Sequence, residues 1–172
     1  MNKSIRLVSL LAVLLGASSV TANEEQGASA SFLDAQDQQV GTAQLSAVPS
    51  GGVLIDIELT GLPANQWVAV HIHETGNCDH GSGHASAGGH FNPTASDHGF
   101  HSESGPHSGD MPNQYVGADG VLRAQIHNAM VSLDQPTDGI RGRAIMVHAG
   151  ADDYASQPAG DAGARIACAV VE

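Results

Sequence analysis

Positive charge is scarce in this sequence of 172 residues. Lysine occurs only at Lys3, whereas aspartate and glutamate together number 18. Beyond residue 22 the only cations are four arginines, which leaves a formal charge near −14 with neutral histidines; they are Arg123, Arg141, Arg143 and Arg165. Such a chain has no general attraction for nucleic acid or anionic lipid, so we expect neither as a partner. The acidity itself is explained by solubility, but each arginine becomes a candidate for a specific role.

Long hydrophobic runs are absent after the N-terminus. Lys3 and Arg6 precede the apolar run 7–17, and small residues follow it up to Ala22. This order is typical of a secretory signal peptide, and the run is too short to span a bilayer. An uncleaved amphipathic anchor is the alternative, but the run lacks helical alternation. We predict a signal peptide over residues 1–22, cleavage after Ala22, and an exported protein that has no membrane attachment after cleavage.

Cysteine is also rare, with one residue at Cys78 and one at Cys168. In an exported protein an even, low count favours a disulfide. A bridge between residues ninety positions apart removes about 4–5 kcal/mol of denatured-state entropy on the loop-closure argument. A pair of metal-binding thiolates is the weaker alternative, because neither cysteine has a close cysteine neighbour.

Helical periodicity is missing outside the predicted signal peptide. Short segments with period-2 alternation, separated by Gly and Pro, favour an all-β sandwich or barrel. We expect residues 23–30 to form a loose N-terminus and 77–113 to form a long loop, with a second loop over 150–164. The expected strands lie within residues 31–36, 39–48, 53–62, 66–74, 120–130, 141–149 and 165–171. A polar loop as long as 77–113 indicates a functional segment.

Histidines supply the chemistry that this loop and its neighbouring strands can carry. His71 and His73 form an H-x-H pair in a strand pattern, so both side chains lie on one face. His148 ends another apolar strand, and His90 opens the loop segment `HFNP`. Four imidazoles suit Cu(II), although zinc also accepts them. The sequence thus predicts a metal site from these four histidines together, because an H-x-H pair alone is only a weak indication of bound metal.

A second group of ligands follows along the same loop. His90, His98 and His107 are eight and nine residues apart, and Asp110 comes three residues later. Three nitrogens and one carboxylate oxygen are typical of a structural zinc site. His90 belongs to both groups, and an imidazole can bind one ion on each ring nitrogen if it loses its proton. We therefore expect two ions with His90 between them, zinc ordering a loop that has few apolar residues.

The motifs `HIHETGNC`, `SAGGHFNP`, `HGFHSESGPHSGDMPN`, `IMVHAGADD` and `AGARIACAVV` closely resemble the copper/zinc superoxide dismutases of the bacterial exported type. The resemblance covers residues 41–172, with 23–40 as an N-terminal segment that contains the first strand. It implies an eight-stranded Greek-key β-barrel, an immunoglobulin-like sandwich with long metal-binding and active-site loops. The implied activity is dismutation of superoxide to oxygen and hydrogen peroxide, as antioxidant defence in the periplasm or outside the cell.

The resemblance also implies a role for each site residue. It places copper, the redox metal, on His71, His73, His90 and His148, and zinc on His90, His98, His107 and Asp110, one ion of each per subunit. Asp152 would link the two sites by hydrogen bonds, and Cys78 would be joined to Cys168. Arg165 would attract the superoxide anion beside copper, and His90 would exchange a proton, which makes these two the expected catalytic residues.

Four histidines, the segment before Arg165 and Trp67 fall outside this assignment. We expect His80 and His84 to be solvated loop residues, with assistance in metal capture as the alternative, and His127 to be a surface or strand histidine. The motif `HGFH` offers His101 as a rival to His98, but the spacing to His107 and Asp110 favours His98. The segment before Arg165 contains no lysine, where many relatives have lysine and acidic residues that steer the substrate. Trp67 is expected in the core or at its rim. The family includes both monomers and homodimers.

Two other functions compete with an enzyme. An exported copper or zinc buffer is supported by the surplus of loop histidines, but a buffer has no need of Arg165. In a purely structural β-domain zinc would order the loop without copper, but His71, His73 and His148 would then have no use.

Overall fold

The computed structural model describes residues 27–172, so the predicted signal peptide 1–22 lies outside the described residues. Nine strand segments and two short 3₁₀ turns make up its regular structure: β1 Gly27–Asp34, β2 Gln39–Ala47, β3 Val53–Leu59, β4 Gln66–Val68, β5 Val70–His73, η1 His80–Ser82, η2 Ala85–Ala87, β6 Gln114–Val116, β7 Leu122–Asn128, β8 Ala144–His148 and β9 Arg165–Val170. Within these residues no helix has the length and apolar character that crossing a membrane requires.

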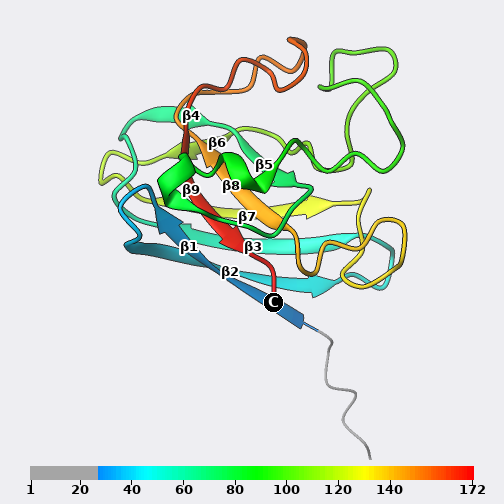
Figure 1. Cartoon of the computed structure of the whole chain (residues 1–172), viewed down its shortest axis with the longest axis horizontal. Helices are drawn as coiled ribbons and strands as arrows, with labels where there is room; N and C mark the ends of the chain where they lie inside the picture. Colours follow the sequence, from blue (N-terminus) through cyan, green and yellow to red (C-terminus); the bar gives the residue numbers. More distant parts are fainter. Residues whose placement is uncertain (1–26) are drawn as a thin grey trace, which may run out of the picture.

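The strands form a curled antiparallel barrel (Figure 1). One sheet has the order β5-β8-β9-β1-β2-β3-β7, and β4 pairs with β6 in a second sheet. Only Ala69 separates β4 from β5, so this bent strand passes from one sheet to the other, and β6 lies beside β7. With β4 and β5 taken as one strand, the described residues form an eight-stranded Greek-key barrel. The predicted all-β fold is confirmed.

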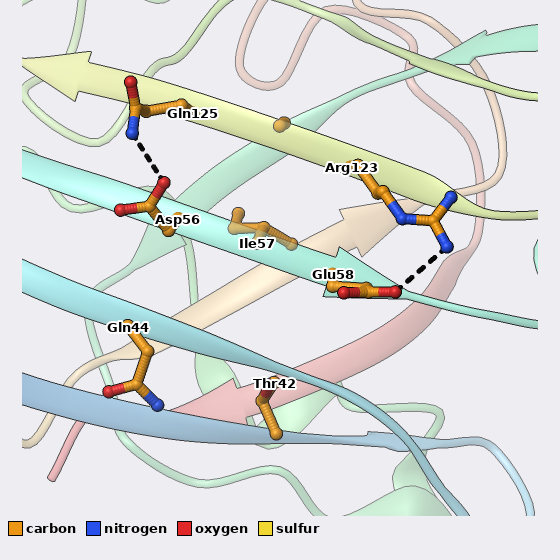
Figure 2. Close-up of a pocket in the computed structure, with 8 residues that line it drawn as sticks. Thr42, Gln44, Asp56, Ile57, Glu58, Arg123 and Gln125 are labelled. Carbon is orange, nitrogen blue, oxygen red and sulfur yellow. Dashed lines mark hydrogen bonds and ion pairs between the residues drawn. The ribbon is translucent and has the colours of Figure 1, made fainter.

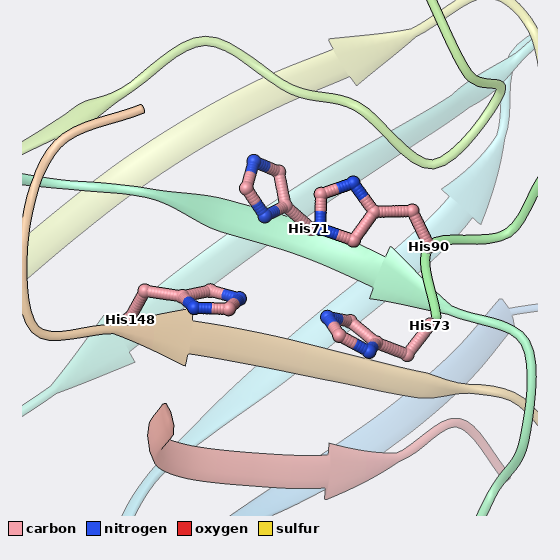
Figure 3. Close-up of side chains that lie close together, drawn as sticks. All are labelled: His71, His73, His90 and His148. Carbon is pink, nitrogen blue, oxygen red and sulfur yellow. The ribbon is translucent and has the colours of Figure 1, made fainter. Parts of the chain in front are cut away.

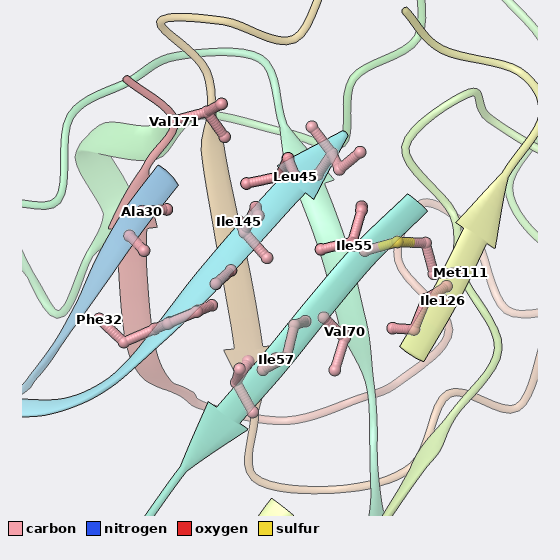
Figure 4. Packing of buried hydrophobic residues seen from close by; sticks show 14 of the residues in the cluster. Ala30, Phe32, Leu45, Ile55, Ile57, Val70, Met111, Ile126, Ile145 and Val171 are labelled. Carbon is pink, nitrogen blue, oxygen red and sulfur yellow. The ribbon is translucent and has the colours of Figure 1, made fainter. Parts of the chain in front are cut away.

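Alternating side chains fill the barrel. β3 shows the pattern of an antiparallel strand with one wet face: Val53, Ile55 and Ile57 are buried, while Asp56 and Glu58 are exposed. Side chains from opposite strands meet in the interior, as Figure 4 shows for Phe32, Ile55, Ile145 and their neighbours. Each such side chain contributes about 1.5–3 kcal/mol when fully removed from water. The core thus supplies a rigid frame for the strands that carry histidines.

The outer face of β2, β3 and β7 is polar, and a shallow pocket lies on it (Figure 2). Arg123 forms an ion pair with Glu58 at 3.1 Å, and Gln125 donates to Asp56 at 2.7 Å. Because both charges of the ion pair are exposed, it contributes at most about 1 kcal/mol. This use of Arg123 is structural and involves none of the predicted metal ligands.

β5 and β8 are buried along their whole length. Val70 and Ile72 face the core, whereas His71 and His73 point to the opposite face, which the long loop covers. The loop is attached there by backbone hydrogen bonds between Ile72 and both Phe91 and Gly109. A polar loop therefore forms the outer layer over two barrel strands, and the histidines lie between the layers.

Three sequence expectations about local structure were wrong. The first strand begins at Gly27, because the segment expected to be a loose terminus pairs with β2 from Gly27↔Ser46 onward. A short strand, β6, follows the long loop directly and had not been predicted. The third expected strand ends at Leu59, because Gly61 takes a left-handed φ of 74° and interrupts the extended backbone.

Candidate metal centre

Four histidines from three separate segments converge beneath the loop (Figure 3). His71 and His73 come from β5, His148 ends β8, and His90 comes from the loop and bridges to His73 through the backbone. All four are buried, and each offers one ring nitrogen within 4.8 Å of those of the others. The structure thus brings together the set that the sequence predicted for copper.

Each of these rings has one nitrogen fixed and the other free. His71 Nε2 contacts Asp152 Oδ2 at 2.8 Å, His73 Nδ1 contacts the Gly88 carbonyl at 3.0 Å, and His148 Nδ1 contacts the Gly163 carbonyl at 3.3 Å. Four buried nitrogens have no hydrogen-bond partner: His71 Nδ1, His73 Nε2, His90 Nε2 and His148 Nε2. Buried unpaired polar atoms are costly, and oriented imidazoles with one free nitrogen are what a metal ion needs. The donor set therefore fits a metal.

The environment keeps these rings neutral. Burial lowers the pKa of His71 to about 4, although the hydrogen bond that His71 donates to Asp152 opposes this shift. Burial likewise lowers the pKa of His148 to about 3, and the nearby His71 adds to the effect. At neutral pH the free nitrogens therefore carry lone pairs rather than protons, which is the form that binds a metal.

A second set surrounds Asp110. One carboxylate oxygen lies 2.8 Å from His90 Nδ1 and 3.4 Å from His107 Nδ1, and the other lies 3.0 Å from His98 Nδ1. Burial disfavours the charged carboxylate, but hydrogen bonds from His90 and the Gly99 N–H hold the pKa of Asp110 well below its usual range. Three nitrogens and an ionised carboxylate oxygen fit zinc. His90 thus directs Nε2 to the first set and Nδ1 to the second.

Asp152 connects the two sets. Its carboxylate contacts His71 Nε2 at 2.8 Å and His98 Nε2 at 3.0 Å, and it accepts a hydrogen bond from the Tyr154 N–H. Burial disfavours the charge, but the hydrogen bonds from both histidines lower the pKa of Asp152. The carboxylate orients one ring of each set, the role that the resemblance implied.

Two residues that sequence reasoning missed fix Asp152 in place. Asn113 donates from Nδ2 to the Asp152 carbonyl at 2.9 Å and accepts from the Asp152 N–H at 2.8 Å. Gly160, with φ of 69°, lies so close that a Cβ would overlap Asp152 Oδ1 and come within 2.7 Å of His98 Nε2. The `DMPN` motif already contained Asn113, but no local pattern indicated which backbone it would reach.

The disulfide prediction is confirmed. Cys78 and Cys168 are bonded and no free cysteine remains, which excludes the alternative of metal-binding thiolates. The bridge joins the loop segment before η1 to β9, the strand that begins with Arg165.

Arg165 lines a cavity together with His73, His90 and His148. Its guanidinium donates to the His84 carbonyl at 2.8 Å and to the Gly88 carbonyl at 2.7 Å. By contrast, Arg141 pairs with Asp134 and Arg143 lies over the Phe91 ring. Because neutral carbonyls hold Arg165, its positive charge stays available to an anion in the cavity.

The remaining histidines are divided between surface and interior. His101 is exposed and lies outside both ligand sets, and His80 is exposed beside Asp37. His127 contacts the Gly51 carbonyl at the surface of β7. His84 is fully buried, so the expectation that it is solvated was wrong. The loop folds back over this residue, which its polar neighbours in the sequence do not reveal.

Trp67 lies at the rim rather than in the core. It is 55% exposed and packs edge to face against Tyr115 on the β4–β6 pair.

A barrel that carries two buried ligand sets joined through one imidazole defines a dinuclear metalloprotein. Comparison with known proteins narrows this class, because the profile of the copper/zinc superoxide dismutase (SODC) family matches residues 39–171. The chain belongs to that family of copper- and zinc-dependent enzymes, which dismute superoxide.

Individual relatives match this chain over nearly their whole length. Superoxide dismutase [Cu-Zn] 2 of Aquifex aeolicus is 40% identical over 96% of this chain and 98% of its own length. Superoxide dismutase [Cu-Zn] of Deinococcus radiodurans is 36% identical over 100% and 98%. Among solved structures, a SOD-like protein from Bacillus subtilis has a TM-score of 0.79 at 34% identity, covering 82% of this chain and 95% of its own. The Cu/Zn superoxide dismutase from Brucella abortus has a TM-score of 0.70 at 28% identity, covering 86% and 100%.

Proposed function

We propose that this chain dismutes superoxide with copper on His71, His73, His90 and His148 and zinc on His90, His98, His107 and Asp110. The observation that carries the proposal is the position of His90, whose two ring nitrogens face the two ligand sets. The all-imidazole set suits Cu(II), and the set with a carboxylate suits zinc. When bound, copper supplies one-electron redox chemistry, while zinc keeps a fixed oxidation state.

The protein's own part begins with binding the anion. Arg165 is always charged and lies on the cavity wall, so it positions superoxide beside the first ligand set. The net negative charge of the chain opposes the approach of an anion, and residues 150–164 contain no lysine. Attraction is therefore local: Arg165 lines the cavity and is held by neutral carbonyls, whereas Glu74, which also lines it, accepts a hydrogen bond from the Gly89 N–H.

Proton handling is the second part. Formation of hydrogen peroxide from superoxide consumes protons, and His90 Nε2 faces the first ligand set and is buried without a hydrogen-bond partner. We assign to this atom the uptake and release of one proton, while Nδ1 stays on the Asp110 side. Asp152 keeps His71 and His98 in fixed orientations so that neither ring follows His90 when it changes protonation.

We further propose that the protein works outside the cytoplasm, in the periplasm or the extracellular space. Bacterial relatives of the same family and the Cys78–Cys168 disulfide support export. The predicted cleavage after Ala22 would release the chain from the membrane. It would act on superoxide as a monomer or homodimer, without a nucleic-acid partner.

Superoxide decay after pulse radiolysis tests this function. The wild type and the His148→Ala variant would be compared at measured copper and zinc content, and we expect fast decay that the variant loses. Stoichiometric copper without accelerated decay in the wild type would contradict the proposal and support a metal buffer.

A further inference from the structure

His84 is a buried histidine that belongs to neither ligand set. It has no exposed surface and ranks among the largest fully buried side chains of the described residues. Neither of its ring nitrogens makes a hydrogen bond of good geometry, although the backbone of Cys78 acts on the ring. A buried polar ring without well-formed hydrogen bonds costs free energy, so it is not explained by its own polar contacts.

The backbone of His84 is also unusual. With φ of 60° and ψ of 16° it adopts the left-handed conformation, which few residues other than glycine adopt and histidine tolerates better than most. Its N–H donates to the Asp79 carbonyl at 3.0 Å, and its carbonyl accepts from the Ala87 N–H at 3.2 Å. This conformation directs the same carbonyl to Arg165 Nη1, 2.8 Å away.

The two residues that flank η2 both bind Arg165 through their backbone carbonyls, and we call these two carbonyls the η2 clamp. His84 precedes the turn and binds Nη1, and Gly88 follows it and binds Nη2 at 2.7 Å. The Gly88 carbonyl also contacts His73 Nδ1 at 3.0 Å, so the clamp couples the guanidinium to a residue of the first ligand set. A shift of the turn would therefore move Arg165 relative to that set.

The surroundings of the ring favour its neutral form. Burial lowers the pKa of His84, and the nearby charges of His80 and Arg165 act in the same direction, whereas the Cys78 carbonyl and Asp34 oppose it. A neutral ring adds no charge that would repel the adjacent guanidinium. The side chain thus fills the space under the loop without disturbing the field that attracts an anion.

From these contacts we infer that His84 is a positioning residue for Arg165. Its buried ring locks the segment between the disulfide and His90 so that the η2 clamp directs the guanidinium into the cavity. The inference rests on the proposed role of Arg165 as the contact for superoxide. It gives a specific role to a histidine that sequence reasoning assigned to the loop surface.

The test measures how well Arg165 is held, using phenylglyoxal, which modifies arginine. The holoprotein of known metal content would be labelled, and the rate at Arg165 divided by the rate at the exposed Arg123 of the same molecule. In His84→Gly the backbone still accepts the left-handed conformation, and the same effect in His84→Asn, which adds no glycine flexibility, assigns it to the ring. We expect the ratio to rise about tenfold, as for loss of a hydrogen bond to a charged group.

The exposed His80 provides the matched control in the same loop, and His80→Ala should leave the ratio unchanged. The inhibition constant of azide, a small anion, should rise about tenfold in His84→Gly, which means weaker binding, and remain unchanged in His80→Ala. An unchanged labelling ratio in His84→Gly would overturn the inference. If that variant does not fold, His84→Asn, which also accepts the left-handed conformation but is smaller, should raise the ratio; failure to do so would overturn it equally.

The labelling ratio does not depend on dismutation, so the two proposals fail separately. A wild-type protein with protected Arg165 but no dismutase activity would refute the proposed function alone. An active protein whose Arg165 is held equally well without the His84 ring would refute only the positioning role.

Discussion

Replacement of Gly160 by alanine tests whether Asp152 must be held in place to orient one histidine of each ligand set. The new Cβ would overlap Asp152 Oδ1 and crowd His98 Nε2, and the residue has a left-handed φ of 69°. The backbone penalty is about 1–2 kcal/mol, and loss of a hydrogen bond to the carboxylate adds about 1.5–3 kcal/mol. We expect Gly160→Ala to destabilise the protein by about 2.5–5 kcal/mol.

Gly61 provides a control for the backbone term alone. It has a similar φ of 74°, but nothing lies within 4 Å of where its Cβ would be. We expect Gly61→Ala to cost only about 1–2 kcal/mol. At about 2–4 °C per kcal/mol for a domain of this size, the melting temperature should fall by about 10 °C in Gly160→Ala and by about 4 °C in Gly61→Ala.

Calorimetry at matched metal content measures these differences, and competition with a chromophoric chelator measures zinc affinity. Because Asp152 orients His98, zinc affinity should fall about 10- to 100-fold in Gly160→Ala and remain unchanged in Gly61→Ala. Equal melting temperatures and equal zinc affinities for the two variants would show that Asp152 need not be held in place.

Three further predictions follow from the charges and cross-links. The metal-free protein should lose stability as pH falls from about 6.5 towards 4, because the unfolded chain binds protons at histidines such as His71 and His148 before the folded chain does. Urea unfolding at pH 7 and pH 5 measures the free energy of unfolding, and equal values at the two pH values would contradict this prediction. Replacement of Cys78 and Cys168 by serine should cost about 2–5 kcal/mol in guanidinium unfolding, and an unchanged midpoint would contradict the loop-closure argument. Arg165→Lys cannot contact both clamp carbonyls in the same planar geometry, so superoxide decay at constant copper content should slow about tenfold, and an unchanged rate would exclude guidance by the guanidinium.

The sequence predicted those features that depend on local spacing. The H-x-H pair in a strand placed His71 and His73 on one face, and the spacing from His90 to Asp110 indicated a second ligand set. The disulfide followed from the cysteine count together with the predicted export. Each of these inferences uses a periodicity or a count that tertiary structure does not alter.

Features that depend on contacts between distant segments could not be predicted. His84 has only small and polar neighbours in the sequence, yet the loop buries it completely. Gly160 resembles any other loop glycine, although Asp152 occupies the place where its Cβ would be. The strand that contains Ala69 reads as continuous, but the barrel requires it to leave β6 and join β8 there. In all three cases the decisive partner is remote in sequence.

Diffraction from crystals of the metal-loaded protein, with anomalous data at the copper and zinc absorption edges, shows which metal each ligand set binds. We expect copper at ligand distance from His90 Nε2 and zinc at ligand distance from His90 Nδ1, in the sets that contain His148 and Asp110 respectively. Zinc in both positions, or a copper ion that does not contact His90, would contradict it.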